Sequence, residues 1–598
     1  MDNKHSLSRR DFIRLSALTL GGMVIAGCRR EEIAPAPATP VPAATAPPIV
    51  SATITSRPGV ISAPTVASSP YAETIFVNGK VIVMDTADTV AQAVAVKDGL
   101  IGKTGTDQAI RALAGPNTKT IDLRGRVLMP GLIDPHLHLR VMGLQNTFFI
   151  PFMPPEVKTL PEMQTKLAQI AAKTPKGEWI VAYFFTIGGV TAIPAKEDLD
   201  KAAPDHPVFV MHQAGHYATV NSLGLKMAGV TASTSSPSGG IIEKDAKGEP
   251  TGRLFNHRAM NVVRSKIPPY SPEMVRTSIV ETAALFAACG VTSFQDNNVY
   301  GEGDISAYQD VAKQGMMSIR GSYYHTLEWP ADLPAALKLK PFDESNMKFG
   351  GYKFLIDGQA TTAYCHEPHN GTRWNMSTWE ASSYKQVVRA LHDTGMQICV
   401  HCGGDAAVDL TIDAFEEAMK ANPRPDPRHR IEHAVLTTPQ ATKRMRDLGI
   451  IVSTNPIFIR SSGDAYFALF GEKRTQERGI VTREWLDAKI PVTIGSDAPT
   501  TPWYTPQATL AAAVARLTLT NRVMGANHVM TIKEALRAHT ITAAYAAFEE
   551  KIKGSLEPGK LADLIVWTQD PYAMNPGQLV EATIDLTMVG GKTVYQKT

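Results

Sequence analysis

The alternation of apolar and polar residues predicts short β-strands near both ends of the chain. Residues 74–82 and 91–96 alternate with the period of two that is typical of half-buried strands, and Asn78-Gly79 marks a turn inside the first segment. Residues 562–567 and 586–595 have the same pattern. Strands at both ends of the mature chain, around a middle of different character, predict one small β-sandwich assembled from both ends.

The middle of the chain has a different pattern, in which short apolar runs rich in β-branched residues alternate with helix-like stretches. Residues 271–288, 383–394 and 439–448 are typical of helices that separate the apolar runs. This alternation predicts an α/β fold built on a parallel sheet, and eight strands make it a (β/α)8 barrel of the TIM type. The eight strands are expected to end near Asp134, Asp296, Tyr324, Asp357, His401, His433, Asn455 and Asp497.

A long insert, at about residues 151–269, separates the first expected strand from the second. It has strand-like segments of its own at 179–185 and 208–211, and Gly239-Gly240 predicts a hairpin turn. Loops that follow barrel strands lie at the face where catalytic groups collect. The insert is therefore expected to lie over the mouth of the barrel and to shape the pocket.

The N-terminus has the features of an export signal. Arg9-Arg10 and Phe12-Ile13 precede an apolar run at residues 15–26, which is too short to span a bilayer comfortably. The paired arginines resemble a twin-arginine signal, and the residues around Cys28 resemble a lipobox, which implies lipidation of that cysteine. A cleaved soluble signal with an incidental cysteine is the alternative. We expect an extracytoplasmic protein, tethered to a membrane through the Cys28 lipid.

These patterns divide the chain into consecutive parts. Ala, Pro, Thr and Ser dominate the segment after the signal, which is typical of a disordered linker. The expected parts are the signal at 1–28, the linker at 29–70, the first part of the β-sandwich at 71–130, the barrel at 131–554 and the second part of the β-sandwich at 555–598.

Composition excludes two broad classes of protein. The formal net charge is only +3 for 598 residues, which gives no support for the basic face that nucleic-acid binding needs, so we expect no nucleic-acid partner. Five cysteines scattered through so long a chain do not form the framework of a disulfide-stabilised domain. What remains is an ordinary globular protein whose function depends on local motifs.

Histidines at the ends of the expected strands are the strongest candidates for chemistry. His136 and His138 share one strand face because side chains alternate along a strand, so the pair can chelate one transition-metal ion. By itself a His-x-His pair is equally compatible with a polar pair inside a barrel. The other strands add further candidates that converge on the same end of a barrel, namely Lys353, His401, His433 and Asp497.

Longer motifs around these residues resemble the amidohydrolase superfamily, in particular the branch called amidohydrolase-3 or YtcJ-like. The resemblance extends from about Tyr71 to Tyr595. It rests on six segments, which are Pro-Gly-Leu-Ile-Asp-Pro-His-Leu-His at 130–138, Gly-His-Tyr-Ala-Thr-Val-Asn-Ser at 215–222, His-Cys-Gly-Gly-Asp at 401–405, Ile-Glu-His at 431–433, Gly-Ser-Asp-Ala-Pro at 495–499 and Gly-Ser-Leu-Glu-Pro-Gly-Lys-Leu-Ala-Asp at 554–563.

The resemblance implies a site with two divalent metal ions, with zinc as the default metal. His136, His138 and Asp497 would bind the first ion. His401 and His433 would bind the second, and Lys353, carboxylated by CO2, would bridge the two. The alternatives are an ion pair between Lys353 and Asp357, and a site with one metal only.

The implied activity is hydrolysis of a non-peptide amide, N-acyl or N-formyl bond by a metal-activated hydroxide. Asp497 would be the general base and then the general acid. His216 in the insert is expected to contact the substrate, and Asp405 and Glu432 are expected to orient ligands. Aromatic residues that follow strand ends are candidates for the pocket wall or for the core, namely Trp374, Phe458, Phe467, Trp503 and Tyr504.

Two other functions remain open at this stage. Heterocycle deaminases of the superfamily resemble one another in having a glutamate three residues after the fifth-strand histidine, whereas this chain has Gly404 there. A non-catalytic, lipid-tethered binding or regulatory protein on the same scaffold is the second alternative, because a fold does not fix a function. Intact candidates at all six ligand positions argue against it.

Overall fold

A computed structural model describes residues 70–154, 156–184, 192–213, 215–344, 346–370 and 375–597. Tyr71–Thr598 form one compact unit. The signal, Cys28 and almost all of the linker lie outside the described residues, so those interpretations stay predictions. None of the helices in the described residues combines the length and the apolarity that a membrane span requires.

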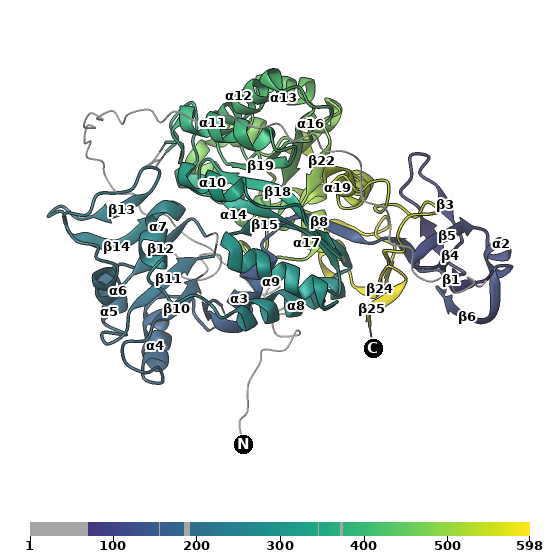
Figure 1. Cartoon of the computed structure of the whole chain (residues 1–598), viewed down its shortest axis with the longest axis horizontal. Coiled ribbons are helices and arrows are strands. Elements are labelled where there is room, and N and C mark those ends of the chain that lie inside the picture. The colour runs from purple at the N-terminus through teal and green to yellow at the C-terminus, as the bar shows by residue number, and fades with distance from the viewer. Residues whose placement is uncertain are drawn as a thin grey trace. The chain divides into compact units, whose positions relative to one another are not determined.

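Eight parallel strands form a nearly closed barrel, which confirms the predicted fold class (Figure 1). The sheet begins at β8, runs through β15, β16, β18, β19, β20 and β21, and ends at β22. The first and last strands approach one another at their carboxyl ends, where the Asp497 N–H donates to His136 O and the His138 N–H donates to Ala498 O, both at 2.8 Å. The strands are β8 (Leu132–Leu137), β15 (Val291–Val299), β16 (Arg320–Leu327), β18 (Met347–Leu355), β19 (Gln397–Cys402), β20 (Arg430–His433), β21 (Ile451–Thr454) and β22 (Val492–Ile494).

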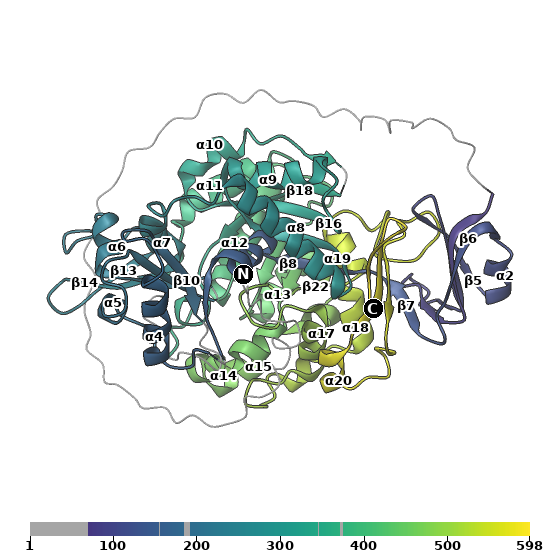
Figure 2. The same ribbon diagram turned by 90° about the horizontal axis from the view of Figure 1, so that it is seen from below.

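Helices between the strands surround the barrel, and the three predicted from sequence are present (Figures 1 and 2). Their first turns explain where they begin. Ser271 and Thr438 accept hydrogen bonds from backbone N–H groups of the first turns of α8 and α13, and each of those helices has proline at its start. The helices named below include α3 (Leu139–Phe148), α8 (Pro272–Ala288), α9 (Gly301–Lys313), α11 (Ala381–His392), α12 (Asp405–Ala421) and α13 (Pro439–Asp447).

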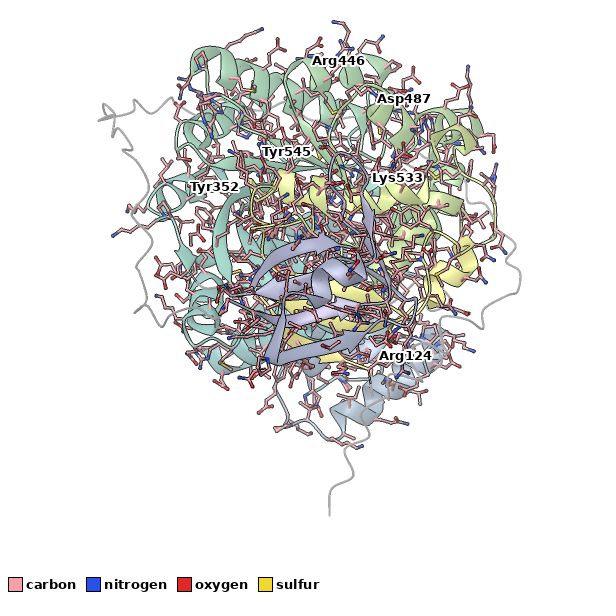
Figure 3. All side chains as sticks on the ribbon, turned by 90° about the vertical axis from the view of Figure 1, so that its right-hand side faces the viewer. Arg124, Tyr352, Arg446, Asp487, Lys533 and Tyr545 are labelled. Atoms are coloured by element: carbon pink, nitrogen blue, oxygen red, sulfur yellow. The ribbon has the colours of Figure 1, made fainter. Side chains whose placement is uncertain are left out.

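Two smaller sheets stack on one another beside the barrel, and both ends of the folded chain contribute to one of them (Figure 3). In the sheet that contains strands from both ends of the chain, β7 pairs with β23 so that Pro130 lies opposite Leu564. The turn expected at Asn78-Gly79 is real, with Asn78 at φ +58°, but it leads from one sheet into the other. One sheet contains β5 (Leu100–Gly105), β4 (Ala93–Lys97), β1 (Ala72–Val77) and β6 (Ala114–Asp122); the other contains β25 (Lys592–Gln596), β24 (Ile584–Val589), β23 (Leu564–Trp567), β7 (Val127–Pro130), β2 (Lys80–Ile82) and β3 (Val90–Ala91).

The insert folds into a six-stranded sheet of its own. Its strands, in sheet order, are β13 (Ile241–Lys244), β14 (Pro250–Phe255), β12 (Tyr217–Val220), β11 (Val208–His212), β10 (Ile180–Phe184) and β9 (Ile150–Phe152). The two predicted strands correspond to β10 and β11.

The hairpin predicted at Gly239-Gly240 is wrong. Its turn lies at residues 245–249, where the Asp245 N–H donates to Glu249 O at 2.9 Å and the Asp245 carboxylate accepts from the Lys247 and Glu249 N–H groups. Gly239 does lie in a turn, at φ +75° with the Gly240 N–H donating to Pro237 O, but the turn is not a hairpin, and a Cβ atom on Gly239 would lie 2.4 Å from Thr378 O. That glycine allows a close approach between insert and barrel backbones.

Candidate active site

A cavity of about 500 Å³ opens at the carboxyl ends of the barrel strands. Five of the six predicted ligand residues line it, and the sixth, His136, contacts Asp497 and His433 beside it. The insert supplies much of the opposite wall, as the sequence predicted. The five lining residues are His138, Lys353, His401, His433 and Asp497. The structure therefore brings all six sequence candidates together at one end of the barrel.

His136, His138 and Asp497 form a compact group with the geometry of a metal site. Their potential ligand atoms all lie within 4.8 Å of one another. Nε2 of His136 and Nε2 of His138 lie 3.2 and 3.0 Å from Oδ1 of Asp497. Oδ1 of Asp497 and Nε2 of His136 nevertheless have no hydrogen-bond partner among the described residues. Buried ligand-type atoms that converge without bonding to one another fit a shared cation.

His401 and His433 form a second group beside the first. Their ring centroids lie 4.4 Å apart, and the centroid of His433 lies 4.6 Å from that of His136. Nδ1 of His433 lies 2.7 Å from Oδ1 of Asn455, whose Nδ2 donates to Gly495 O. Asn455 therefore accepts the Nδ1 proton of His433 and leaves a lone pair on Nε2, the arrangement that a metal ligand needs.

The backbone at two of these residues has an unusual conformation. His433 has φ +68° and Asp497 has φ +52°, both in the left-handed region that non-glycine residues rarely adopt. Each residue lies at or just beyond the carboxyl end of its strand, β20 or β22. Such conformations cost energy and collect at functional sites, because the surrounding structure must hold them.

Lys353 is a buried lysine without a partner among the residues that the structure describes. It lies on β18, is 2% exposed, and forms no hydrogen bond or ion pair with any described residue. Burial lowers the pKa of Lys353, and the carboxylates of Glu432 and Asp497 oppose that shift. The alternative ion pair with Asp357 is absent from the described contacts, because the Asp357 carboxylate instead accepts from the N–H groups of Gly403, Gly404 and Tyr364.

Glu432 orients His136, as the sequence led us to expect. Its carboxylate accepts from Nδ1 of His136 and also binds Arg430, whose Nε and second amino group lie 2.7 and 2.9 Å away. Burial acts to raise the pKa of Glu432, but Arg430 and His136 hold it far below its usual value. The same expectation for Asp405 is wrong, since its carboxylate binds Arg474 at 2.7 Å and the N–H of His366.

Asp497 is held in its ionised form. Burial acts to raise the pKa of this carboxyl, yet contacts with the imidazoles of His136 and His138 outweigh burial and hold the pKa well below the usual value. Thr500 also donates to Oδ2 of Asp497 at 2.9 Å. An ionised carboxylate at this position can accept a proton from a water molecule in the cavity.

The insert contributes two imidazoles to the cavity wall, the buried His216 and the half-buried His257, and the sequence identified only the first. His216 lies with its ring centroid 5.2 Å from that of His401 and 5.8 Å from that of His257. Burial lowers the pKa of His216 to about 4 and holds the pKa of His257 well below its usual value, which favours the neutral form of both rings. The Asn256 N–H donates to His216 O at 2.7 Å and joins the two segments. His257 starts a helix without any local motif, so no sequence signal marks it.

The expected aromatic wall differs from the observed one. Phe458 stacks on His433 beneath the cavity, and Phe467, Trp503 and Tyr504 pack against the hydrophobic core. Trp374 lies outside the described residues. The aromatic residues that line the cavity are instead Phe149, Phe209 and Tyr270. They follow the first barrel strand or belong to the insert, whose fold brings them over the mouth.

Comparison with protein families identifies the chain. The family model described as "Amidohydrolase family" matches residues 119–595. The chain belongs to the amidohydrolase family. This assignment confirms the resemblance that the motifs carried, and the match begins within the first small sheet and ends in the last strand of the second.

Individual amidohydrolase relatives cover most of the chain. An N-substituted formamide deformylase of Arthrobacter pascens is 27% identical over 541 residues, which are 88% of this chain and 98% of the relative. A putative amidohydrolase of Bacillus subtilis, YtcJ, is 28% identical over 85% of this chain and 96% of its own length. The structure of an uncharacterized metal-dependent hydrolase of Pyrococcus horikoshii has a TM-score of 0.66, with 22% identity over 84% of this chain and 99% of that one.

The family and these relatives support the predicted class of activity. The protein is an amidohydrolase, a metal-dependent hydrolase that acts on carbon–nitrogen bonds other than peptide bonds. The solved structure supports the fold alone, because its backbone is similar although its sequence identity is low.

Proposed function

We propose that this amidohydrolase cleaves N-acyl or N-formyl amide bonds with a pair of divalent metal ions. The observation that carries the proposal is the convergence of two ligand groups around one buried lysine. His136, His138 and Asp497 would hold the first ion, and His401 and His433 the second. The deformylase relative acts on an N-substituted formamide, which matches this class of bond.

The donors suit zinc, which takes imidazole nitrogen and carboxylate oxygen as ligands. Ions held there would lower the pKa of a bound water and polarise the carbonyl of the substrate. Imidazoles that remain neutral keep the lone pairs that such ions need. Burial lowers the pKa of both His401 and His433 and so favours their neutral forms.

Lys353 is proposed to be a carbamate that bridges the two ions. A neutral amine is required to capture CO2, and the depressed pKa of Lys353 favours the neutral amine. Addition of CO2 to the amine, with loss of one proton, gives a group whose single negative charge is shared by two oxygens, and this charge would partly compensate the cations in a buried site. The absence of any other described partner for Lys353 supports this role.

Asp497 is proposed to move the proton during the reaction. As an ionised carboxylate it would accept a proton from the attacking water and then give it to the leaving nitrogen. His216 and His257 would bind the substrate carbonyl. An oxygen that accepts from both rings lies roughly 4 Å from each ring centroid when the N···O distance is about 2.9 Å, and the 5.8 Å between the two centroids allows that position.

Deamination of a heterocycle is the less favoured function, because Gly404, at the position where the deaminases have a glutamate, has no room for a side chain. A Cβ atom on Gly404 would lie 1.9 Å from Tyr364 O, so a glutamate could not occupy this backbone. A non-catalytic role is disfavoured because all six candidate ligands are present and close to one another.

We also propose that the protein works outside the cytoplasm, attached to a membrane by a lipid on Cys28. Arg9-Arg10 before an apolar run supports export by a twin-arginine route, which transports folded proteins, and a site that acquires metal in the cytoplasm suits such a route. The small residues before Cys28 support lipidation.

Metal analysis followed by a substrate panel tests the proposed hydrolysis. Purified protein should contain about two divalent ions per chain, and a strong chelator should abolish hydrolysis of formamides and N-acyl amides. Added zinc should restore it. Cyclic imides and aminated heterocycles complete the panel. Protein that binds no metal, or that releases ammonia from heterocycles faster than it cleaves amides, would contradict the proposal.

A further inference from the structure

The charges on the cavity wall are unbalanced. The described residues that carry charge on this wall are Arg140, Arg264 and a single carboxylate, Asp497, besides Lys353, which is proposed above to be a carbamate. Asp497 already faces two histidines at 3.2 and 3.0 Å. Divalent cations at the ligand group would make the cavity more positive still. A cavity with this charge distribution attracts an anionic ligand and repels a cationic one.

Arg264 is a cation on this wall whose guanidinium has no described hydrogen bond or ion pair. It ends α7 (Asn256–Arg264), is half-buried, and its side chain forms no hydrogen bond or ion pair with any described residue. The nearby carboxylate of Glu328 attracts Arg264 electrostatically, but the described contacts contain no hydrogen bond or ion pair between the two side chains. Asp304 binds Arg140 at 3.1 Å, and the carboxylate of Glu328 accepts from the side-chain amide of Asn261.

Arg140 places a fixed hydrogen-bond donor on the same wall as Arg264. It lies on α3 and is 8% exposed, and one of its terminal nitrogens binds Asp304 while another donor, Nε, has no partner in the described part of the chain. A buried guanidinium that is anchored at one end keeps its remaining donors in a fixed place. Asp304 and Asp296 compensate the charge of Arg140, so what it offers an anion is the Nε donor that has no described partner.

The wall around these cations is apolar. Leu144, Phe149, Phe209, Ile267 and Tyr270 line the cavity, and the rings of Phe149 and Tyr270 stack with their centroids 5.7 Å apart. Such a surface gains free energy by covering an apolar group of the substrate. A ligand that fits this wall therefore combines an anionic group with an apolar side chain.

We infer that Arg264 binds a carboxylate of the substrate, and that the substrates are N-acyl or N-formyl amino acids with apolar side chains. A guanidinium matches a carboxylate with two parallel hydrogen bonds, which fixes the orientation of the substrate as well as its affinity. The amide bond of such a substrate would face the ligand group while its side chain covers the apolar wall. The inference rests on the proposed amide hydrolysis and specifies its substrate class.

Pairs of substrates that differ only in the carboxylate test this inference. N-acetylphenylalanine and N-formylphenylalanine, in both enantiomers, are compared with N-acetyl- and N-formylphenethylamine on the metal-loaded enzyme. The wild type should prefer the acids by at least tenfold in kcat/KM. Arg264→Gln should lose about 10- to 100-fold on the acids, mainly through KM, and nothing on the phenethylamides. Lys266→Gln is the matched control, because Lys266 is exposed two residues away and does not line the cavity.

Calorimetry with 3-phenylpropanoate measures the same contact without turnover. Binding should weaken by a similar factor in Arg264→Gln and stay unchanged in Lys266→Gln. Equal binding by wild type and Arg264→Gln, or equal hydrolysis within each substrate pair, would overturn the inference and leave the proposed amide hydrolysis standing. Arginine-dependent binding of 3-phenylpropanoate without hydrolysis of any amide would overturn the proposed function and support the carboxylate site.

Discussion

Glu432 accepts a hydrogen bond from Nδ1 of His136, and this contact turns Nε2 of His136 toward Asp497. The two residues are far apart in the chain, on β20 and β8, and the barrel brings them together. Arg430 binds both carboxylate oxygens of Glu432 from the same strand, so the acceptor is itself fixed. Ligand orientation in this site therefore depends on a buried chain of three charged or polar groups.

Replacing Glu432 should weaken the metal site without removing a ligand. In Glu432→Gln the acceptor for His136 loses its charge and Arg430 loses its ion pair, so metal affinity should fall about 10- to 100-fold. Competition with a chromophoric chelator measures the affinity. Asp405→Asn is the control, since Asp405 binds Arg474 instead of a ligand. Equal metal affinity in Glu432→Gln and wild type would mean that Glu432 does not orient His136.

The bridge proposed at Lys353 predicts chemical rescue. Lys353→Ala should lose most of the metal at the second site and most of the turnover, because no other described side chain replaces the anionic bridge. Added formate or acetate should restore part of both by supplying a carboxylate. Metal content by mass spectrometry and hydrolysis rates are measured with and without the acid. Undiminished metal content and rate in Lys353→Ala would rule out the bridge.

A buried histidine outside the site predicts how stability depends on pH. Burial lowers the pKa of His539 to about 4, while Nδ1 lies 3.0 Å from Ile133 O. The unfolded chain has a histidine pKa near 6.5, so between these values the unfolded state binds the extra proton. The stability contributed by neutral His539 is therefore complete above about pH 6.5 and is lost as the pH falls toward 4.

The variant His539→Gln isolates this effect from packing. At pH 8 the variant should melt at a lower temperature than wild type, because a buried ring has been lost. At pH 5 the difference in melting temperature should be smaller, because between about pH 6.5 and 4 only the wild type loses folding stability through His539, by about 1.4 kcal/mol per pH unit. Thermal melts of both proteins at pH 8 and pH 5 measure this difference. A difference in melting temperature that does not change with pH would contradict the low pKa of His539.

The export proposal makes a prediction about location. Cys28→Ala should leave the protein exported and no longer attached to membranes, because the lipid site is gone. Replacing Arg9-Arg10 by two lysines should hold the precursor in the cytoplasm. Fractionation of cells with an antibody to the folded part measures both. Wild-type protein wholly in the soluble fraction would contradict lipidation, and normal export of the lysine variant would contradict the twin-arginine route.

The barrel and its ligands could be predicted because their signals are local. Most barrel strands contain a short apolar or β-branched stretch, and five of the six ligand candidates lie on a barrel strand or directly after one. Parallel strands present their carboxyl ends at one face, so residues such as His136 and His433 had to meet once the strands were identified. The clash at Gly404 agrees with the absence of the deaminase glutamate.

The wall of the cavity could not be predicted because it depends on contacts made by the insert. His257 and Arg264 lie on a helix with no motif, and only the pairing of β12 with β14 brings that helix to the mouth. Glycine is typical of turns, but at position 239 the close approach of the Thr378 backbone also requires a glycine. Local patterns contain no information on which distant backbone lies next to a residue.

Asp497 is proposed to move a proton as well as to bind metal. Asp497→Asn keeps the shape of the side chain and a potential ligand oxygen, so the fold and at least one metal should remain. Turnover per bound metal should fall by about two to four orders of magnitude, because an amide cannot accept the proton of the attacking water. The decisive measurement is amide hydrolysis normalised to metal content in wild type and Asp497→Asn. A large drop in turnover per metal supports proton transfer by Asp497, and near wild-type turnover per metal would contradict it.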